Sequence, residues 1–188
     1  MIVELGHFAL ILAFAVAVFQ ATVPLWGALR QDGVLVRLAP RAAIAQFVLT
    51  ALAFAALTHA YLNSDFSVLN VFQNSHSLKP LIYKWSGVWG NHEGSMLLWV
   101  LILALFGAAV AVFSRRLPDD ILGATLAVQA VVAGAFIAFL LFTSNPFLRL
   151  PNAPFEGRDL NPVLQDPGLA IHPPLLYLGY VGFSIVFS

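Results

Sequence analysis

Residues 95–113 read SMLLWVLILALFGAAVAVF, an apolar run without one charged side chain. A helix needs about 20 such residues to cross the ~30 Å hydrocarbon core of a bilayer. Three more runs meet this condition, at residues 8–29, 42–62 and 121–143. A fifth begins near Pro173 and is still apolar at Ser188, which indicates the N-terminal part of a longer protein. Because backbone groups in lipid must be hydrogen-bonded within a helix, the pattern predicts an all-α, polytopic membrane helix bundle.

The composition agrees with a membrane protein, since 60% of the 188 residues are hydrophobic and 10% are charged. About a quarter of the residues are charged in an ordinary soluble domain. The net charge is zero and no basic block occurs, which argues against nucleic acid as a partner. The chain has no cysteine, so it supplies no disulfide, thiolate ligand or thiol nucleophile of its own.

The distribution of Lys and Arg predicts the orientation in the membrane. The two short loops, 30–41 and 114–120, hold five of the nine basic residues in about 19 positions. The two long loops, 63–94 and 144–172, hold the other four in about 61 positions. Basic residues gather on the cytoplasmic side, so we expect the N-terminus and both long loops outside, in the periplasm of a bacterium.

The first long loop runs into the third span through WSGVWGNHEGSMLLW, residues 85–99. Trp89 and its neighbouring tryptophans, together with several glycines, could form a surface for a planar apolar ligand that His92 contacts. The alternative is an aromatic belt at the lipid headgroups, followed by a helix start that Asn91 caps. Composition alone leaves both interpretations open.

The second long loop is rich in proline and ends in DPGLAIHPPLLY, residues 166–177. A residue that precedes proline is disfavoured in the helical region, so we expect His172 to be extended, just above a helix that starts at Pro173. An imidazole held there could ligate a metal or haem iron, or could simply hydrogen-bond a neighbouring loop. Arg149 and Arg158 could each pair with a haem propionate or form a local salt bridge.

The outer segments resemble the haem-handling proteins of cytochrome c biogenesis, of the CcmF and NrfE type. The resemblance rests on WGNHEGSMLLW (89–99), FTSNPF (142–147), EGRDLNPVLQDPG (156–168) and HPPLLYLGY (172–180), and it extends over essentially the whole chain. It implies an inner-membrane subunit of a cytochrome c haem lyase that takes haem b from the chaperone CcmE. With CcmH, such a subunit supports thioether attachment of the haem to apocytochrome c.

The resemblance also implies that His172 is one of two periplasmic haem ligands, because its His-Pro-Pro-Leu-Leu-Tyr setting matches. The tryptophan-rich haem-binding segment, the second periplasmic histidine and the histidines of a structural haem have no counterpart in these residues. Two other hypotheses stay open, a non-catalytic scaffold for haem delivery and a transporter or energy-converting subunit. The middles of the four complete spans hold no Asp, Glu, Lys or Arg, which argues against the transporter.

Overall fold

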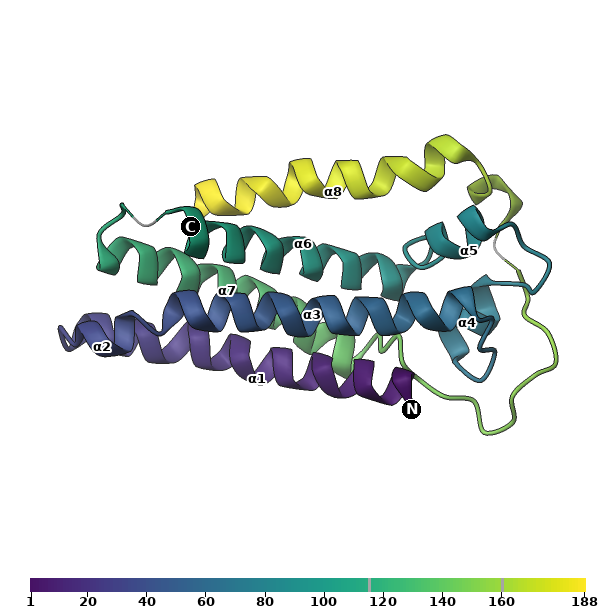
Figure 1. The fold of residues 1–188 in the computed structure, drawn as a ribbon, viewed down its shortest axis with the longest axis horizontal. Coiled ribbons are helices and arrows are strands. Elements are labelled where there is room, and N and C mark those ends of the chain that lie inside the picture. The colour runs from purple at the N-terminus through teal and green to yellow at the C-terminus, as the bar shows by residue number, and fades with distance from the viewer. Residues whose placement is uncertain (115, 160) are drawn as a thin grey trace.

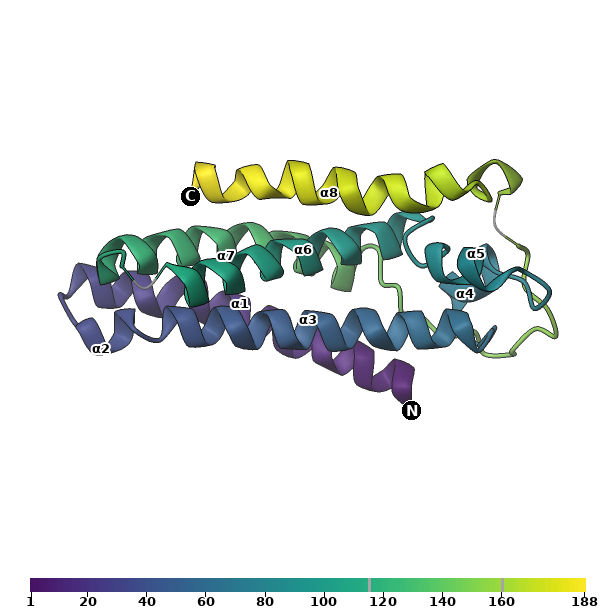
Figure 2. The ribbon, with the colours of Figure 1, turned by 45° about the horizontal axis from the view of Figure 1, so that its top comes forward.

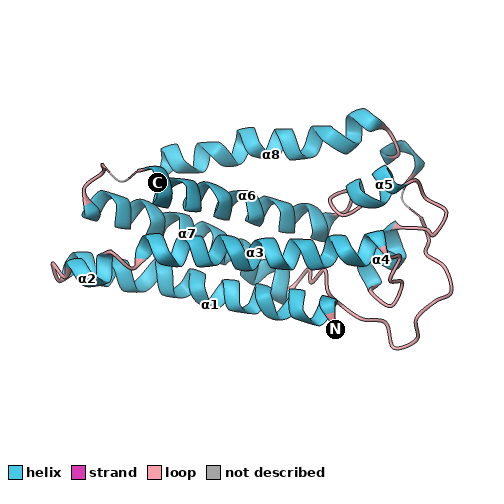
Figure 3. Cartoon of the chain, viewed as in Figure 1, coloured by secondary structure: helices cyan, strands magenta, loops and turns pink. Residues whose placement is uncertain are grey.

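Helices form almost all of the regular structure (Figures 1 and 3). The structure, a computed structural model, describes residues 1–114, 116–159 and 161–188. The long helices are α1 (Ile2–Leu29), α3 (Ala39–Leu62), α6 (His92–Phe113), α7 (Asp119–Phe142) and α8 (Pro167–Phe187). The short ones are α2 (Gly33–Val36), α4 (Leu69–Asn74), α5 (Leu81–Ser86) and the 3-10 helix η1 (Pro162–Leu164).

The long helices have the length and composition of membrane spans. At 1.5 Å per residue, the 22 residues of α6 cover about 33 Å, enough for the hydrocarbon core of a bilayer. Five helices in the described part of the chain meet both conditions. The prediction of an all-α, multi-pass membrane protein is therefore confirmed.

Four of these helices form the bundle proper, and the fifth lies along one side of it. α1 packs against α3 and α7, while α6 packs against α3 and α7. Small residues allow close approach: a Cβ at Gly6 of α1 would lie 2.5 Å from Ala56 Cβ of α3. α8 packs mainly along α6 and forms a separate layer (Figure 2).

One end of the bundle carries an ordered cap, which we define as residues 63–91, 143–159 and 161–166. The cap contains α4, α5 and η1, and the N-terminus lies at the same end (Figure 1). The opposite end carries α2 and the α6–α7 connection, near the C-terminus (Figure 1). The two long connections predicted from the sequence thus lie together at one end of the bundle (Figure 1).

Two helix starts follow from local sequence. The side chain of Asn91 accepts a hydrogen bond from the Gly94 backbone N–H at 2.9 Å, so Asn91 caps α6 as expected. Asp119 and Asp120 occupy the first turn of α7 directly after Pro118, where acidic side chains favour the positive end of the helix dipole.

Candidate functional site

The second cap segment, residues 143–159, lies across the first, residues 63–91. Leu69 N–H donates to the carbonyl of Leu148, and Leu150 N–H donates to the carbonyl of Ser67, both at 2.8 Å. Further along, Arg158 N–H donates to the Phe72 carbonyl at 2.7 Å. These backbone bonds order a proline-rich segment that has neither helix nor sheet of its own to hold most of its length.

Charged side chains fasten the cap to the first span. The Arg149 guanidinium pairs with Glu4 at 2.7 Å and with Asp65 at 3.0 Å, which joins α1 to both cap segments. Burial raises the pKa of Asp65, but hydrogen bonds from Ser67 and Arg149 outweigh it and hold the pKa below its usual range. Arg149 is therefore committed to a local ion-pair network, one of the two alternatives that its sequence position left open.

A second charge contact lies deeper in the cap. The buried Lys79 ammonium donates to the Asn74 carbonyl at 2.8 Å and lies 3.9 Å from the Asp159 carboxylate. Burial lowers the pKa of Lys79 to about 8, because the charged ammonium is separated from water. This contact also joins the two cap segments.

The structure corrects the expectation for His172. We expected an extended residue above a helix that starts at Pro173, but α8 starts at Pro167 and contains His172, Pro173 and Pro174. That expectation was wrong because Pro167 already occupies the first position of the helix, which suits a residue without an N–H. The preference against helix before proline is outweighed here by the continuation of α8.

The imidazole of His172 is nevertheless available to a ligand. The residue is exposed and makes no hydrogen bond, ion pair or ring contact with the other described residues of the chain. Leu175 and Leu176, three and four residues further along α8, share its face and are 62% and 40% exposed. A free imidazole beside apolar side chains suits a flat apolar macrocycle that carries an iron atom, so these residues fit haem.

Trp89 does not lie on an exposed aromatic surface that could face a ligand. Its side chain is only 5% exposed, and its indole N–H donates to the Ala170 carbonyl of α8 at 2.9 Å. The ring packs near-parallel to Phe54 and edge-on to Trp85, with centroids 6.5 Å and 4.7 Å away. Trp89 thus joins the cap to the helix that carries His172.

The other two candidate residues lie at the same end of the molecule. His92 is the first residue of α6, is exposed, and meets the Phe139 ring of α7 edge-on at 6.1 Å. The guanidinium of Arg158 lies 5.2 Å from the Phe72 ring centroid, and the residue is exposed. No hydrogen bond, ion pair or ring contact joins any two of His172, His92, Trp89 and Arg158 within the described residues.

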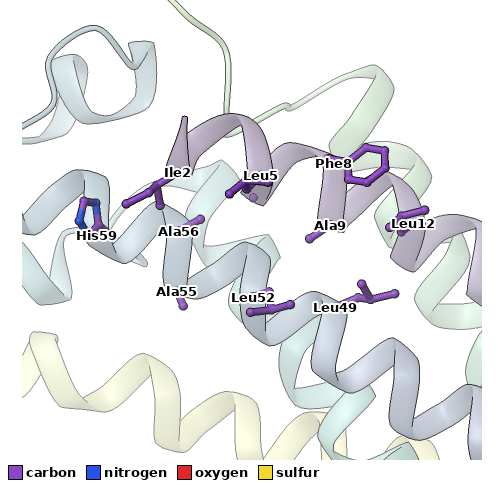
Figure 4. Close-up of a pocket in the computed structure, with 11 residues that line it drawn as sticks. Ile2, Leu5, Phe8, Ala9, Leu12, Leu49, Leu52, Ala55, Ala56 and His59 are labelled. Atoms are coloured by element: carbon purple, nitrogen blue, oxygen red, sulfur yellow. The ribbon is translucent and has the colours of Figure 1, made fainter.

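An apolar groove of about 480 Å³ lies between α1 and α3 (Figure 4). Leu5, Phe8, Leu49 and Leu52 are among its walls, and among the described residues that line it His59 alone has a polar side chain. Its walls offer one imidazole and otherwise only hydrocarbon, and none of the four candidate residues lines it.

Sequence reasoning missed two side chains that organise this end of the bundle. Tyr61 of α3 joins Asn70 and Asn91 by hydrogen bonds of 2.6 Å and 2.9 Å. Tyr177 of α8 stacks on Trp99 at 5.6 Å and hydrogen-bonds the Ser95 hydroxyl. Neither contact follows from a local pattern, because Tyr61 and Asn91 lie 30 positions apart and Tyr177 and Ser95 lie 82 positions apart.

These observations define the class of the protein: it is a multi-pass helical membrane protein that presents an exposed imidazole at its cap end. Comparison with known proteins narrows it. The chain is 65% identical over 188 residues to "Cytochrome c-type biogenesis protein CycK" of Rhizobium meliloti, covering 100% of this chain and 28% of that protein. It is 48% identical over 189 residues to "Cytochrome c-type biogenesis protein CcmF" of Escherichia coli, covering 100% of this chain and 29% of that protein.

A solved structure agrees with both relatives. "Cytochrome c Heme Lyase CcmF" superposes with a TM-score of 0.83 at 28% identity, over 98% of this chain and 29% of that chain. The family of cytochrome C assembly proteins matches residues 89–188. The chain belongs to this family and is of the CcmF type. It spans less than a third of the length of the curated relatives cited here.

Proposed function

We propose that this chain is part of a cytochrome c haem lyase, which takes haem from a haem chaperone and supports its covalent attachment to apocytochrome c. The observation that carries the proposal is the exposed imidazole of His172 on α8, which has no partner among the described residues, in a chain of CcmF type. In this proposal the substrate is haem b, and His172 offers a ring nitrogen to its iron.

The contribution of the protein to the reaction is positioning. A haem vinyl group held close to a cysteine thiol reacts as if the two were one molecule, which can lower the barrier by about 7–11 kcal/mol in favourable cases. The thiols belong to the apocytochrome, in keeping with a chain that has no cysteine. His172 fixes the iron, and Leu175 and Leu176 offer apolar contact on the same helix face.

The remaining candidates have supporting roles in this proposal. The exposed guanidinium of Arg158 can pair with a haem propionate, since it lies over a Phe72 ring rather than in an ion pair with Glu156. His92 is exposed at the start of α6 and can contact the bound ligand or a partner. Trp89 acts indirectly, because its side chain is almost fully buried.

We further propose that the chain lies in the bacterial inner membrane with the N-terminus and the cap in the periplasm. Five of the nine basic residues lie in the two short connections, which favours the cytoplasm for that end. The chaperone CcmE, the subunit CcmH and apocytochrome c would then meet the cap from the periplasm. Lipid surrounds the apolar faces of the spans.

A non-catalytic scaffold for haem delivery is the second candidate, because none of the cap side chains described above is committed to proton transfer. Reconstituted haem attachment with and without this subunit separates the two functions. An attachment rate that does not depend on the subunit would favour the scaffold.

The first test is His172→Ala in the full-length protein, with c-type cytochromes measured by haem staining and protein level by immunoblot. We expect loss of c-type cytochromes at normal protein level, and recovery with added imidazole, which can replace the missing ring at the iron. His76→Ala is the matched control, since His76 is a cap histidine whose ring already contacts the Leu78 N–H and the Glu156 carboxylate. Normal cytochromes in the His172→Ala strain would refute the ligand role.

A further inference from the structure

Helix α8 lacks a backbone hydrogen bond close to His172. In an α-helix each N–H donates to the carbonyl four residues earlier, and proline has no N–H. Pro174 therefore leaves the carbonyl of Ala170 without its helical donor. Ala170 is only 4% exposed, so water has little access to that carbonyl. A buried carbonyl without a partner is costly, about 1–3 kcal/mol.

Trp89 supplies the missing donor. Its indole N–H donates to the Ala170 carbonyl at 2.9 Å, across 81 positions of sequence. Indole nitrogen is a donor only, so this bond uses the one polar capacity of the side chain. We infer that Trp89 is a positioning residue, whose indole N–H replaces the N–H that Pro174 lacks and thereby fixes the part of α8 that carries His172.

The anchor is itself rigid. The Trp89 ring is packed between Phe54 of α3 and Trp85 of α5, and its backbone N–H donates to the Ser86 carbonyl at 3.2 Å. Tyr177 forms a second attachment on the other side of His172. It stacks near-parallel on Trp99 and hydrogen-bonds Ser95, both in α6. His172 thus lies between two points at which α8 is tied to the bundle.

Within the 188 residues of this chain, α8 is the least buried of the five membrane-length helices. Only 11% of its membrane-length window, Ala170–Phe187, is buried, against 33% to 44% for the other four spans. Loss of one tie would let the start of α8 move, and the imidazole would move with it. The inference rests on the proposed function for its consequence, because a fixed imidazole matters if His172 binds iron, but the tie itself can be measured without haem.

The test uses a nitroxide spin label on His172→Cys in full-length protein whose other cysteines, if present, are replaced. Trp89→Phe keeps an aromatic ring, although a smaller one, and removes the N–H, and we expect the label to become more mobile. Trp26→Phe is the matched control, since Trp26 lies near the end of α1, is 53% exposed, and its N–H has no partner among the described residues. Pro174→Ala in the Trp89→Phe background restores a helical N–H for Ala170 and should return the label to its original mobility.

The same variants with His172 intact are then compared by haem-binding titration. We expect Trp89→Phe to weaken binding about fivefold, the effect of one net hydrogen bond, and Pro174→Ala to restore it. An unchanged label in Trp89→Phe, or a change that Pro174→Ala does not reverse, would overturn the inference. If label mobility follows the prediction while His172→Ala binds haem normally, the tie stands and the proposed function fails.

Discussion

The hydroxyl of Tyr61 donates a 2.6 Å hydrogen bond to the Asn70 side-chain carbonyl and accepts a 2.9 Å bond from the Asn91 amide. Asn70 in turn donates to Asn91 at 2.8 Å. The three side chains belong to the end of α3, the middle of the cap and the N-cap of α6. We call Tyr61, Asn70 and Asn91 the polar knot. It fixes the segment from which Trp89 reaches α8.

Removal of the Tyr61 hydroxyl tests the polar knot. The side chain is fully buried, so Tyr61→Phe leaves the Asn70 side-chain carbonyl without its hydrogen-bond donor away from water. We expect a loss of about 1–3 kcal/mol in the free energy of unfolding. Thermal unfolding in detergent measures it, and Tyr83→Phe is the control because the Tyr83 hydroxyl has no partner among the described residues. Equal stability of both variants would show that the knot contributes nothing.

Gly94 cannot carry a side chain without moving the start of α6. A Cβ at Gly94 would lie 1.7 Å from the carbonyl oxygen of Val88, a backbone atom that no side-chain rotation can displace. We expect Gly94→Ala to lower both the yield of folded protein and its melting temperature.

Gly107 lies in the same helix and provides the matched comparison, because a Cβ there would meet nothing within 4 Å. Gly107→Ala should be neutral or stabilise by up to about 1 kcal/mol, since alanine is the better helix former. Similar melting temperatures for the two variants would contradict the close approach at Gly94.

The hydrogen bonds between Ser77 and Glu156, which join the two cap segments, should depend on pH. The hydroxyl of Ser77 donates to the Glu156 carboxylate, as does the Ser77 backbone N–H, and these bonds lower the pKa of Glu156 from 4.5 to about 2. A carboxyl whose pKa is depressed on folding stabilises the fold above its unfolded pKa, and that contribution is lost as pH falls through the folded value. The contribution should therefore disappear between about pH 4.5 and about pH 2.

A nitroxide label on Phe155→Cys reports this change, since Phe155 is fully exposed and adjacent to Glu156. We expect the label to gain mobility as the pH falls through that window. Glu156→Gln should abolish this component, because an amide does not titrate. A label with the same pH profile in both backgrounds would assign the change to another group.

The proposed orientation can be tested with single cysteines. Leu78 lies exposed in the cap and Leu117 lies exposed in the α6–α7 connection at the other end. The cells are treated with a membrane-impermeant maleimide after the outer membrane is permeabilised. We expect Leu78→Cys to react while the inner membrane is intact. Leu117→Cys should react only after the inner membrane is broken. The reverse pattern would place the cap in the cytoplasm.

Much of the architecture could be predicted from local sequence. Apolar runs fix the spans, because lipid offers no partner to backbone groups. Asn91 marks the start of α6 by its side-chain cap, and Pro118 with the two acidic residues after it marks the start of α7. The same local reasoning failed at His172, because a preference against helix before proline is small compared with the contacts that continue α8.

Local sequence was enough to predict the membrane-spanning segments, the starts of two of them and a histidine close to a double proline. Which distant groups meet follows from the packing of the helices: the Trp89 indole meets the Ala170 carbonyl, and the Arg149 guanidinium meets the Glu4 carboxylate, 145 positions away. The two kinds of interaction differ in the distance along the chain over which they act. Hydrophobicity and capping act within one span or one turn. The partner of a charge, or of a hydrogen-bonding group without a local partner, depends on how the helices pack.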